Sequence, residues 1–78
     1  MTDTKLLDRI TVRGDVFGGK PIIRDMRIAV EHVLAKLAAG DSMDTVLSQY
    51  PMLEREDVQA CLLYAYRAVA GEHVYDQS

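Results

Sequence analysis

The sequence predicts one mainly helical domain preceded by short β-strands. Three observations indicate this. The length of 78 residues leaves room for a single domain, and a composition of 49% apolar and 27% charged residues is typical of a folded chain. Near residue 30, the apolar residues change from a period of two, typical of a strand, to the spacing of a helix. We expect flexible tails over residues 1–8 and 76–78, around a domain over 9–75 whose strands and turns lie in 9–29 and whose helices lie in 30–75.

The strand region forms a small sheet or arm in this prediction. Residues 9–13 alternate polar and apolar side chains, so Ile10 and Val12 are expected to point inward. Gly14-Asp15 and Gly18-Gly19 are turn signals, and Pro21 permits an extended entry into Ile22-Ile23. A turn over residues 24–27 then leads to a second short strand over residues 27–29.

Two helices follow the strand region. The first carries one apolar stripe and ends at Gly40, which can adopt a left-handed conformation; the stripe is Val30, Val33, Leu34, Leu37 and Ala38. Asp41 or Ser42 can cap the second helix, and Pro51 ends it. Its apolar residues are Met43, Val46, Leu47 and Tyr50.

The third helix carries two stripes and ends at Gly71. Its expected inner stripe is Val58, Cys61, Leu62, Ala65 and Val69. A second stripe lies about 100° round the helix and consists of Gln59, Leu63, Tyr66 and Ala70. Helices that are apolar on two sides usually pack on two sides, so the second stripe is the candidate partner or dimer interface.

The net charge of −3 divides unevenly along the chain. Residues 1–27 carry six basic and four acidic side chains (+2), whereas residues 28–78 carry three basic and eight acidic ones (−5). Three helices with a tight second turn suggest a helix-turn-helix, but Glu54, Glu56 and Asp57 at the start of the third helix would repel phosphates. A nucleic-acid contact is therefore assigned to the basic front, Arg9, Arg13, Lys20, Arg24 and Arg27. The alternative is that these side chains are solvated or pair with acids of a partner chain.

Motifs for catalysis are weak. Residues 14–20 match G-x-x-x-x-G-K, but Pro21 stands where a phosphate-binding loop needs a hydroxyl and a helix start. Cys61 falls on the inner stripe and is expected to be a core residue, while His32 and His73 match no zinc-site spacing. We expect no enzyme activity, cofactor, metal or small-molecule substrate.

The small size also predicts a partner. A domain this short buries too little surface to be very stable alone, and a single cysteine excludes an internal disulfide, so we expect a homodimer. Since no apolar run approaches the roughly 20 residues that span a bilayer, we expect a soluble, cytoplasmic protein without a membrane partner.

Several of these residues also occur in a known pattern. The blocks Val16-Phe17-Gly18-Gly19-Lys20-Pro21-Ile22-Ile23-Arg24 and Tyr50-Pro51-Met52-Leu53, with Glu56-Asp57-Val58 after them, resemble the bacterial family called Domain of Unknown Function 433. The resemblance covers about residues 9–68. Two turns depart from it: Asp25-Met26 stands where members usually have Gly-Thr, and Gly14-Asp15 where they have Asp-Pro.

The resemblance implies a homeodomain-like, three-helix fold after short strands, commonly dimeric. For members with an assigned role, it implies the antitoxin half of a toxin–antitoxin pair, often beside a PIN-like ribonuclease. The favoured hypothesis is therefore an antitoxin-like protein that neutralises a toxin encoded nearby. The alternative is a small helix-turn-helix DNA-binding autoregulator.

Overall fold

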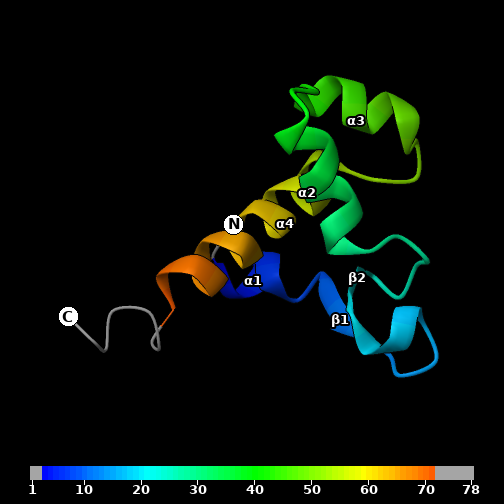
Figure 1. Ribbon diagram of the computed structural model, residues 1–78, viewed down its shortest axis with the longest axis vertical. Coiled ribbons are helices and arrows are strands. Elements are labelled where there is room, and N and C mark those ends of the chain that lie inside the picture. The colour runs from blue at the N-terminus through cyan, green and yellow to red at the C-terminus, as the bar shows by residue number, and fades with distance from the viewer. Residues whose placement is uncertain (1–2, 72–78) are drawn as a thin grey trace.

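The computed structural model describes residues 3–71, which form a mainly helical fold with a small sheet ahead of the main helices (Figure 1). The elements run in the order α1 (Asp3–Leu7), β1 (Ile10–Val12), the single-turn η1 (Phe17–Gly19), β2 (Pro21–Ile23), α2 (Val30–Ala38), α3 (Met43–Gln49) and α4 (Arg55–Ala70). The predicted fold class, helices preceded by short strands, is confirmed. Residues 72–75 of the expected helical region, with His73, and the expected tail over 76–78 lie outside the described part of the chain.

The N-terminal segment differs from the prediction. Within the expected tail over residues 1–8, a short helix α1 forms and lies against α4. Leu6 and Leu7 are half-buried, so apolar contact with the long helix holds a segment that is too short to be a stable helix alone.

The sheet has two antiparallel strands. Ile10 pairs with Ile23, Thr11 with Ile22 and Val12 with Pro21. The second strand was predicted over residues 27–29, but it lies at Pro21–Ile23, and Ala29 forms only an isolated bridge to Ile22. The inward orientation predicted for Val12 is also wrong: Val12 is 64% exposed, because β1 reaches beyond the helices that could cover it.

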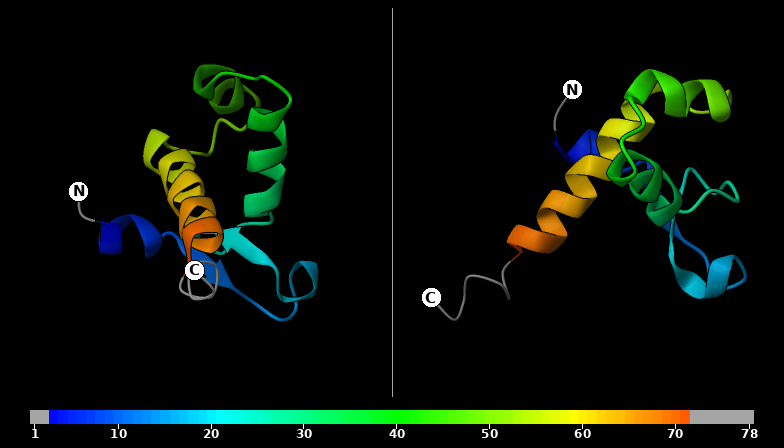
Figure 2. Two further views of the ribbon diagram at one scale, coloured as in Figure 1. Left: turned by 60° about the vertical axis from the view of Figure 1, so that its left-hand side comes forward. Right: turned by 45° about the horizontal axis from the view of Figure 1, so that its top comes forward.

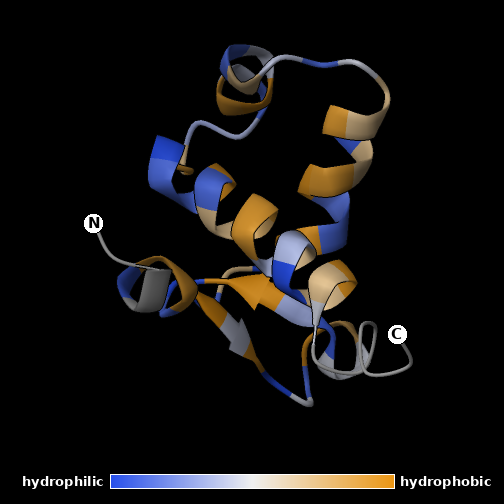
Figure 3. Ribbon diagram, turned by 90° about the vertical axis from the view of Figure 1, so that its left-hand side faces the viewer, coloured by the Kyte–Doolittle hydropathy of each residue, from blue (hydrophilic) through white to orange (hydrophobic). Residues whose placement is uncertain are grey.

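The core lies between the three larger helices and β2. Ile23, Val33, Val46, Val58 and Cys61 are all fully buried and belong to one cluster. Figure 3 shows the hydrophobic segments of α2, α4 and the strands turned toward one another. The predicted inner stripe of the last helix holds at Val58 and Cys61, but Leu62 and Val69 are 45% and 71% exposed. The helix is rotated so that Ala60 and Asp57 are buried in their place.

The helix ends follow the predicted signals. Gly40 has φ +103° just after α2, a left-handed conformation that glycine adopts without cost from a Cβ. Ser42 caps α3 because its Oγ accepts the N–H of Thr45 at 3.1 Å. Together, these two residues set the sharp change of direction between α2 and α3.

The turn after β2 is strained. Arg24 and Asp25 have φ of +45° and +60°, and the N–H of Met26 donates to the carbonyl of Ile23 at 2.8 Å, as in a tight hairpin turn. The backbone N–H of Asp25 also donates to Thr11 Oγ1 at 3.1 Å, and this bond needs no side chain at residue 25.

We predict that Asp25→Gly stabilises the fold. A residue with a Cβ pays a steric cost in the left-handed conformation, and this cost exceeds the extra chain entropy that glycine loses on folding. The free energy of unfolding measured in urea should therefore rise by about 0.5–1 kcal/mol. Asp25→Ala retains the Cβ and serves as the control, with no gain expected. A glycine variant no more stable than the wild type would contradict this account of the turn.

Candidate functional site

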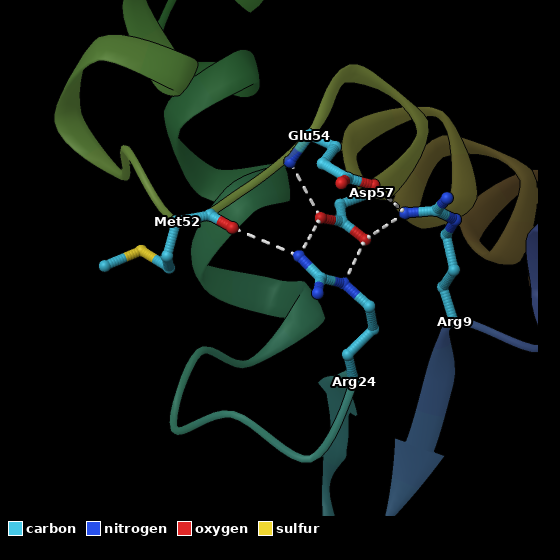
Figure 4. A network of polar contacts seen from close by, with 5 residues as sticks. All are labelled: Arg9, Arg24, Met52, Glu54 and Asp57. Atoms are coloured by element: carbon cyan, nitrogen blue, oxygen red, sulfur yellow. Dashed lines mark hydrogen bonds and ion pairs between the residues drawn. The ribbon is translucent and has the colours of Figure 1, made fainter.

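The basic front predicted from the sequence divides into two groups in the structure. Arg9 and Arg24 turn inward onto Asp57, which is fully buried at the start of α4 (Figure 4). Arg13, Lys20 and Arg27 remain on the surface. The five residues therefore do not form one basic surface.

Arg24 binds Asp57 through two parallel hydrogen bonds. Its Nε donates to Oδ1 at 2.9 Å and its Nη2 to Oδ2 at 2.7 Å, while Nη2 also donates to the carbonyl oxygen of Met52 at 3.1 Å. Paired bonds of this kind need the planar guanidinium of arginine. The turn after β2 is thereby attached to both the α3–α4 connection and α4.

Arg9 completes the network from the other side. Its Nη1 donates to Asp57 Oδ1 at 3.0 Å and to Glu54 Oε1 at 2.7 Å. The backbone N–H of Glu54 donates to Asp57 Oδ2 at 2.8 Å, so the carboxylate also caps α4. Two residues from the strand region thus hold one helix start, and we call Arg9, Arg24, Glu54 and Asp57 the carboxylate clamp.

The clamp keeps Asp57 ionised. Burial alone would raise the pKa of Asp57, but the hydrogen bonds from Arg24, the Glu54 N–H and Arg9 outweigh it and hold this pKa below its usual value of 3.8. The same bonds raise the pKa of Arg9, through Glu54 first and then Asp57, and that of Arg24, through Asp57. The two guanidinium groups are therefore committed to the fold.

The other three basic residues lie beside acids. Arg13 contacts Asp15 at 3.3 Å and Lys20 contacts Glu31 at 3.1 Å. The pKa of Asp15 is lowered by its hydrogen bond from Arg13 and, to a smaller extent, by the charge of Arg27. Three cations beside two acids leave a net charge of only +1, which is weak attraction for a phosphate backbone.

The predicted interface stripe on α4 is only partly exposed. Gln59 and Tyr66 are exposed, whereas Leu63 and Ala70 are half-buried. The rotation of the helix brings Leu62 and Val69 into the exposed stripe, with Tyr66 65% exposed between them. We call Gln59, Leu62, Tyr66 and Val69 the α4 seam.

An apolar groove adjoins the α4 seam. It encloses about 250 Å³ between α2 and the second half of α4, and Val69 belongs to both surfaces. Glu31 is the one charged side chain among its lining residues, and Lys20 pairs with it. The groove is lined by Pro21, Val30, Glu31, Leu34, Tyr64, Ala65, Ala68 and Val69.

The remaining reactive side chains have structural partners. His32 Nδ1 accepts the N–H of Ala29 at 3.3 Å, and its ring meets the edge of Phe17 with centroids 5.3 Å apart. Burial, with a smaller effect from Asp57, raises the pKa of the Cys61 thiol to about 12. Residues 3–71 contain no group of three or more His, Cys, Asp or Glu side chains placed to hold a metal ion. Within the same residues, every helix is too short or too polar to cross a membrane.

Sequence reasoning missed the clamp because it treated Asp57 as a surface charge that would repel phosphates. One signal was present: Asp57 is the third residue of α4, where an acid can reach back to the N–H before the helix. Its pairing with Arg9 and Arg24, 48 and 33 residues away in sequence, carries no local signal.

We predict that Asp57→Asn destabilises the protein by about 3 kcal/mol, because the change leaves two partly buried guanidinium groups without their carboxylate. Urea unfolding followed by circular dichroism measures the loss. Asp15→Asn removes a surface acid of the same type and should leave stability nearly unchanged. Equal effects of the two changes would mean that the clamp adds nothing to the fold.

The clamp also predicts an acid-sensitive fold. Since the pKa of Asp57 is lower in the folded than in the unfolded chain, its contribution is complete above the unfolded value of about 3.9 and is lost as pH falls below it. The urea midpoint of the wild type should fall as pH drops below about 4. Asp57→Asn should show a shallower fall; parallel curves for the two proteins would contradict this source of acid sensitivity.

Two comparisons with known proteins found a match. Residues 10–65 match the family described as "Protein of unknown function (DUF433)". The chain is 36% identical over 56 residues to "Uncharacterized protein y4eO" of Sinorhizobium fredii (strain NBRC 101917 / NGR234). The aligned segment covers 72% of the chain and 25% of that protein. The chain thus spans about a quarter of the length of this relative. No solved structure matches significantly. The matched segment includes β1, β2, α2, α3 and the first eleven residues of α4 with Asp57, and the chain belongs to the DUF433 family.

Proposed function

We propose that the protein is a non-catalytic, antitoxin-like module of the cytoplasm that binds and neutralises a partner toxin of the PIN-like ribonuclease kind, and that it works as a homodimer. The observation that carries the proposal is the continuous apolar surface of α4. The α4 seam and the groove meet at Val69, and three large apolar side chains of the seam are 45–71% exposed. Contiguous exposed apolar surface on a small domain is typical of protein-binding faces.

The groove has the character of a protein-docking site. An apolar side chain of a partner entering it would contact Leu34 of α2 and Ala68 of α4, which line opposite walls. The small side chains of Ala65 and Ala68 allow a partner backbone to approach α4 closely. This chemistry fits an apolar anchor of a protein surface, the kind of residue that dominates binding energy at interfaces.

Two potentially reactive groups support a non-catalytic role. The carboxylate of Asp57 is buried and saturated with hydrogen bonds from Arg9, Arg24 and Glu54. The thiol of Cys61 is buried, and its pKa of about 12 keeps it protonated at neutral pH. Both groups therefore act in the fold.

A helix-turn-helix autoregulator that binds DNA is the second candidate. The short connection between α3 and α4, and the exposed Arg13 and Arg27 near Asp15, favour it. Against it, the start of α4 is acidic, and Arg9 and Arg24 are held by Asp57. The balance of these contacts favours the protein-binding role.

Co-expression with the product of the adjacent gene tests the main proposal. We expect the two proteins to purify together, and we expect the protein to restore growth of cells that express that product. Ala68→Glu places a charge in the groove and should reduce binding at least about tenfold, equivalent to 1.4 kcal/mol. Ser48→Glu, an exposed change on α3, is the matched control. Failure of the wild type to bind or rescue, or full binding by Ala68→Glu, would contradict the proposal.

A gel shift with the protein's own promoter region tests the second candidate. The informative variant changes Arg13, Lys20 and Arg27 to Ala together, because Arg9 and Arg24 are bonded to Asp57 in the carboxylate clamp. A specific shift that disappears in this variant would establish DNA binding by the surface group. A wild type that gives no shift at low salt would eliminate the second candidate.

A further inference from the structure

The spacing along the α4 seam is that of a helix that packs against another helix. Gln59, Leu62, Tyr66 and Val69 follow one another at intervals of three, four and three residues, and all four are exposed. This alternation places side chains on one line along a helix, at the positions that interlock between two packed helices. Nothing within residues 3–71 covers that line, so the seam is suited to an external helix.

The charge pattern defines the chemistry of that helix. The nine residues from Val58 to Tyr66 contain no charged side chain, and they form the centre of α4. A partner that bore charges along its contacting ridge would have to bury them unpaired against this surface, at high cost. The partner must therefore present an uncharged ridge of apolar and aromatic side chains, which is what a second copy of α4 offers.

The two ends of the seam favour an antiparallel arrangement. Arg55, the first residue of α4, pairs with Asp44 at 2.9 Å, but its side chain is 62% exposed and lies on the same side of the helix as the seam. In an antiparallel pair, this cation lies beside the negative end of the other helix dipole, whereas a parallel pair would bring two Arg55 side chains together. Figure 2 shows the last turns of α4 extending away from α3, so α3 does not hinder a second helix along them.

We propose that two copies of this chain pair through antiparallel α4 seams, around a two-fold axis between Leu62 and Tyr66. Leu62 then packs on Tyr66 of the partner subunit, and Gln59 lies opposite Val69 of the partner subunit. This inference deepens the homodimer part of the proposed function and does not depend on the identity of the toxin. It assigns the seam to the second copy and leaves the groove walls at Leu34 and Ala68 for the toxin.

Sedimentation over a concentration series tests the pairing. The wild type should approach twice the chain mass of 8.7 kDa, and Tyr66→Asp should stay monomeric with its helical circular dichroism retained. Ser48→Asp introduces the same charge on α3 and should dimerise like the wild type. A wild type that stays monomeric throughout, or Tyr66→Asp that dimerises fully, would overturn the proposal.

Disulfide trapping tests the orientation. Gln59→Cys and Val69→Cys are prepared as separate proteins and oxidised alone and as a mixture. The antiparallel seam predicts a cross-linked dimer mainly in the mixture, since disulfides need Cα atoms within about 7 Å. Efficient cross-linking of each variant with itself would indicate a parallel pair and overturn the proposed geometry. Wild type treated in the same way controls for Cys61, whose buried thiol should not react.

The two proposals fail in different ways. Ala68→Glu should lose the toxin while remaining a dimer, because Ala68 lines the groove and lies off the seam. If Tyr66→Asp is monomeric but no toxin binds even the wild type, the antiparallel dimer stands and the antitoxin role fails. If the toxin binds and the wild type is monomeric, the dimer fails and the antitoxin role stands.

Discussion

The buried carboxylate of Asp57 is the contact on which the arrangement of the strands and α4 depends. It joins β-hairpin and helix through Arg9 and Arg24, which enter from opposite sides of the α4 start. It also binds the N–H of Glu54 and so fixes where α4 begins. Because a buried ion pair costs desolvation, the intact network adds little net stability, although removing one partner is costly. We interpret its role as fixing a specific geometry. Here the geometry is the rotation of α4, which decides which of its faces are covered.

That rotation links the clamp to the binding surfaces. With Asp57, Ala60 and Cys61 turned inward, the side chains of Leu62, Tyr66 and Val69 are left on the outside. The same rotation sets Ala65 and Ala68 opposite α2, where they form one wall of the groove. A polar contact at the first turn of the helix thus controls an apolar surface two to three turns away, because an α-helix transmits rotation along its length. Two of the five basic residues assigned to nucleic acid from the sequence, Arg9 and Arg24, make this polar contact.

The predictable part of the fold was the part governed by local signals. Helical spacing after residue 29, the cap at Ser42 and the left-handed Gly40 are each decided by neighbouring residues, and each lies where the sequence indicated. The position of β2, the helix over Asp3–Leu7 and the exposure of Val12 depend on contacts between distant segments. The exposed stripe of α4 was predicted with Leu63 and Ala70 where Leu62 and Val69 are exposed, since the apolar period fits either rotation of the helix. In the observed rotation Asp57 faces Arg9 and Arg24. Gln59 and Tyr66 belong to both the predicted stripe and the α4 seam.

The central claim is that the outer face of α4 is a protein-binding surface, used first by a second copy of the chain. Amide chemical shifts recorded by NMR over a range of protein concentrations test it most directly. The account predicts concentration-dependent shifts at Gln59, Leu62, Tyr66 and Val69, with α3 and the strand hairpin unchanged. Shifts of the α4 residues that do not depend on concentration, or changes confined to the exposed basic loop around Arg13, would contradict it.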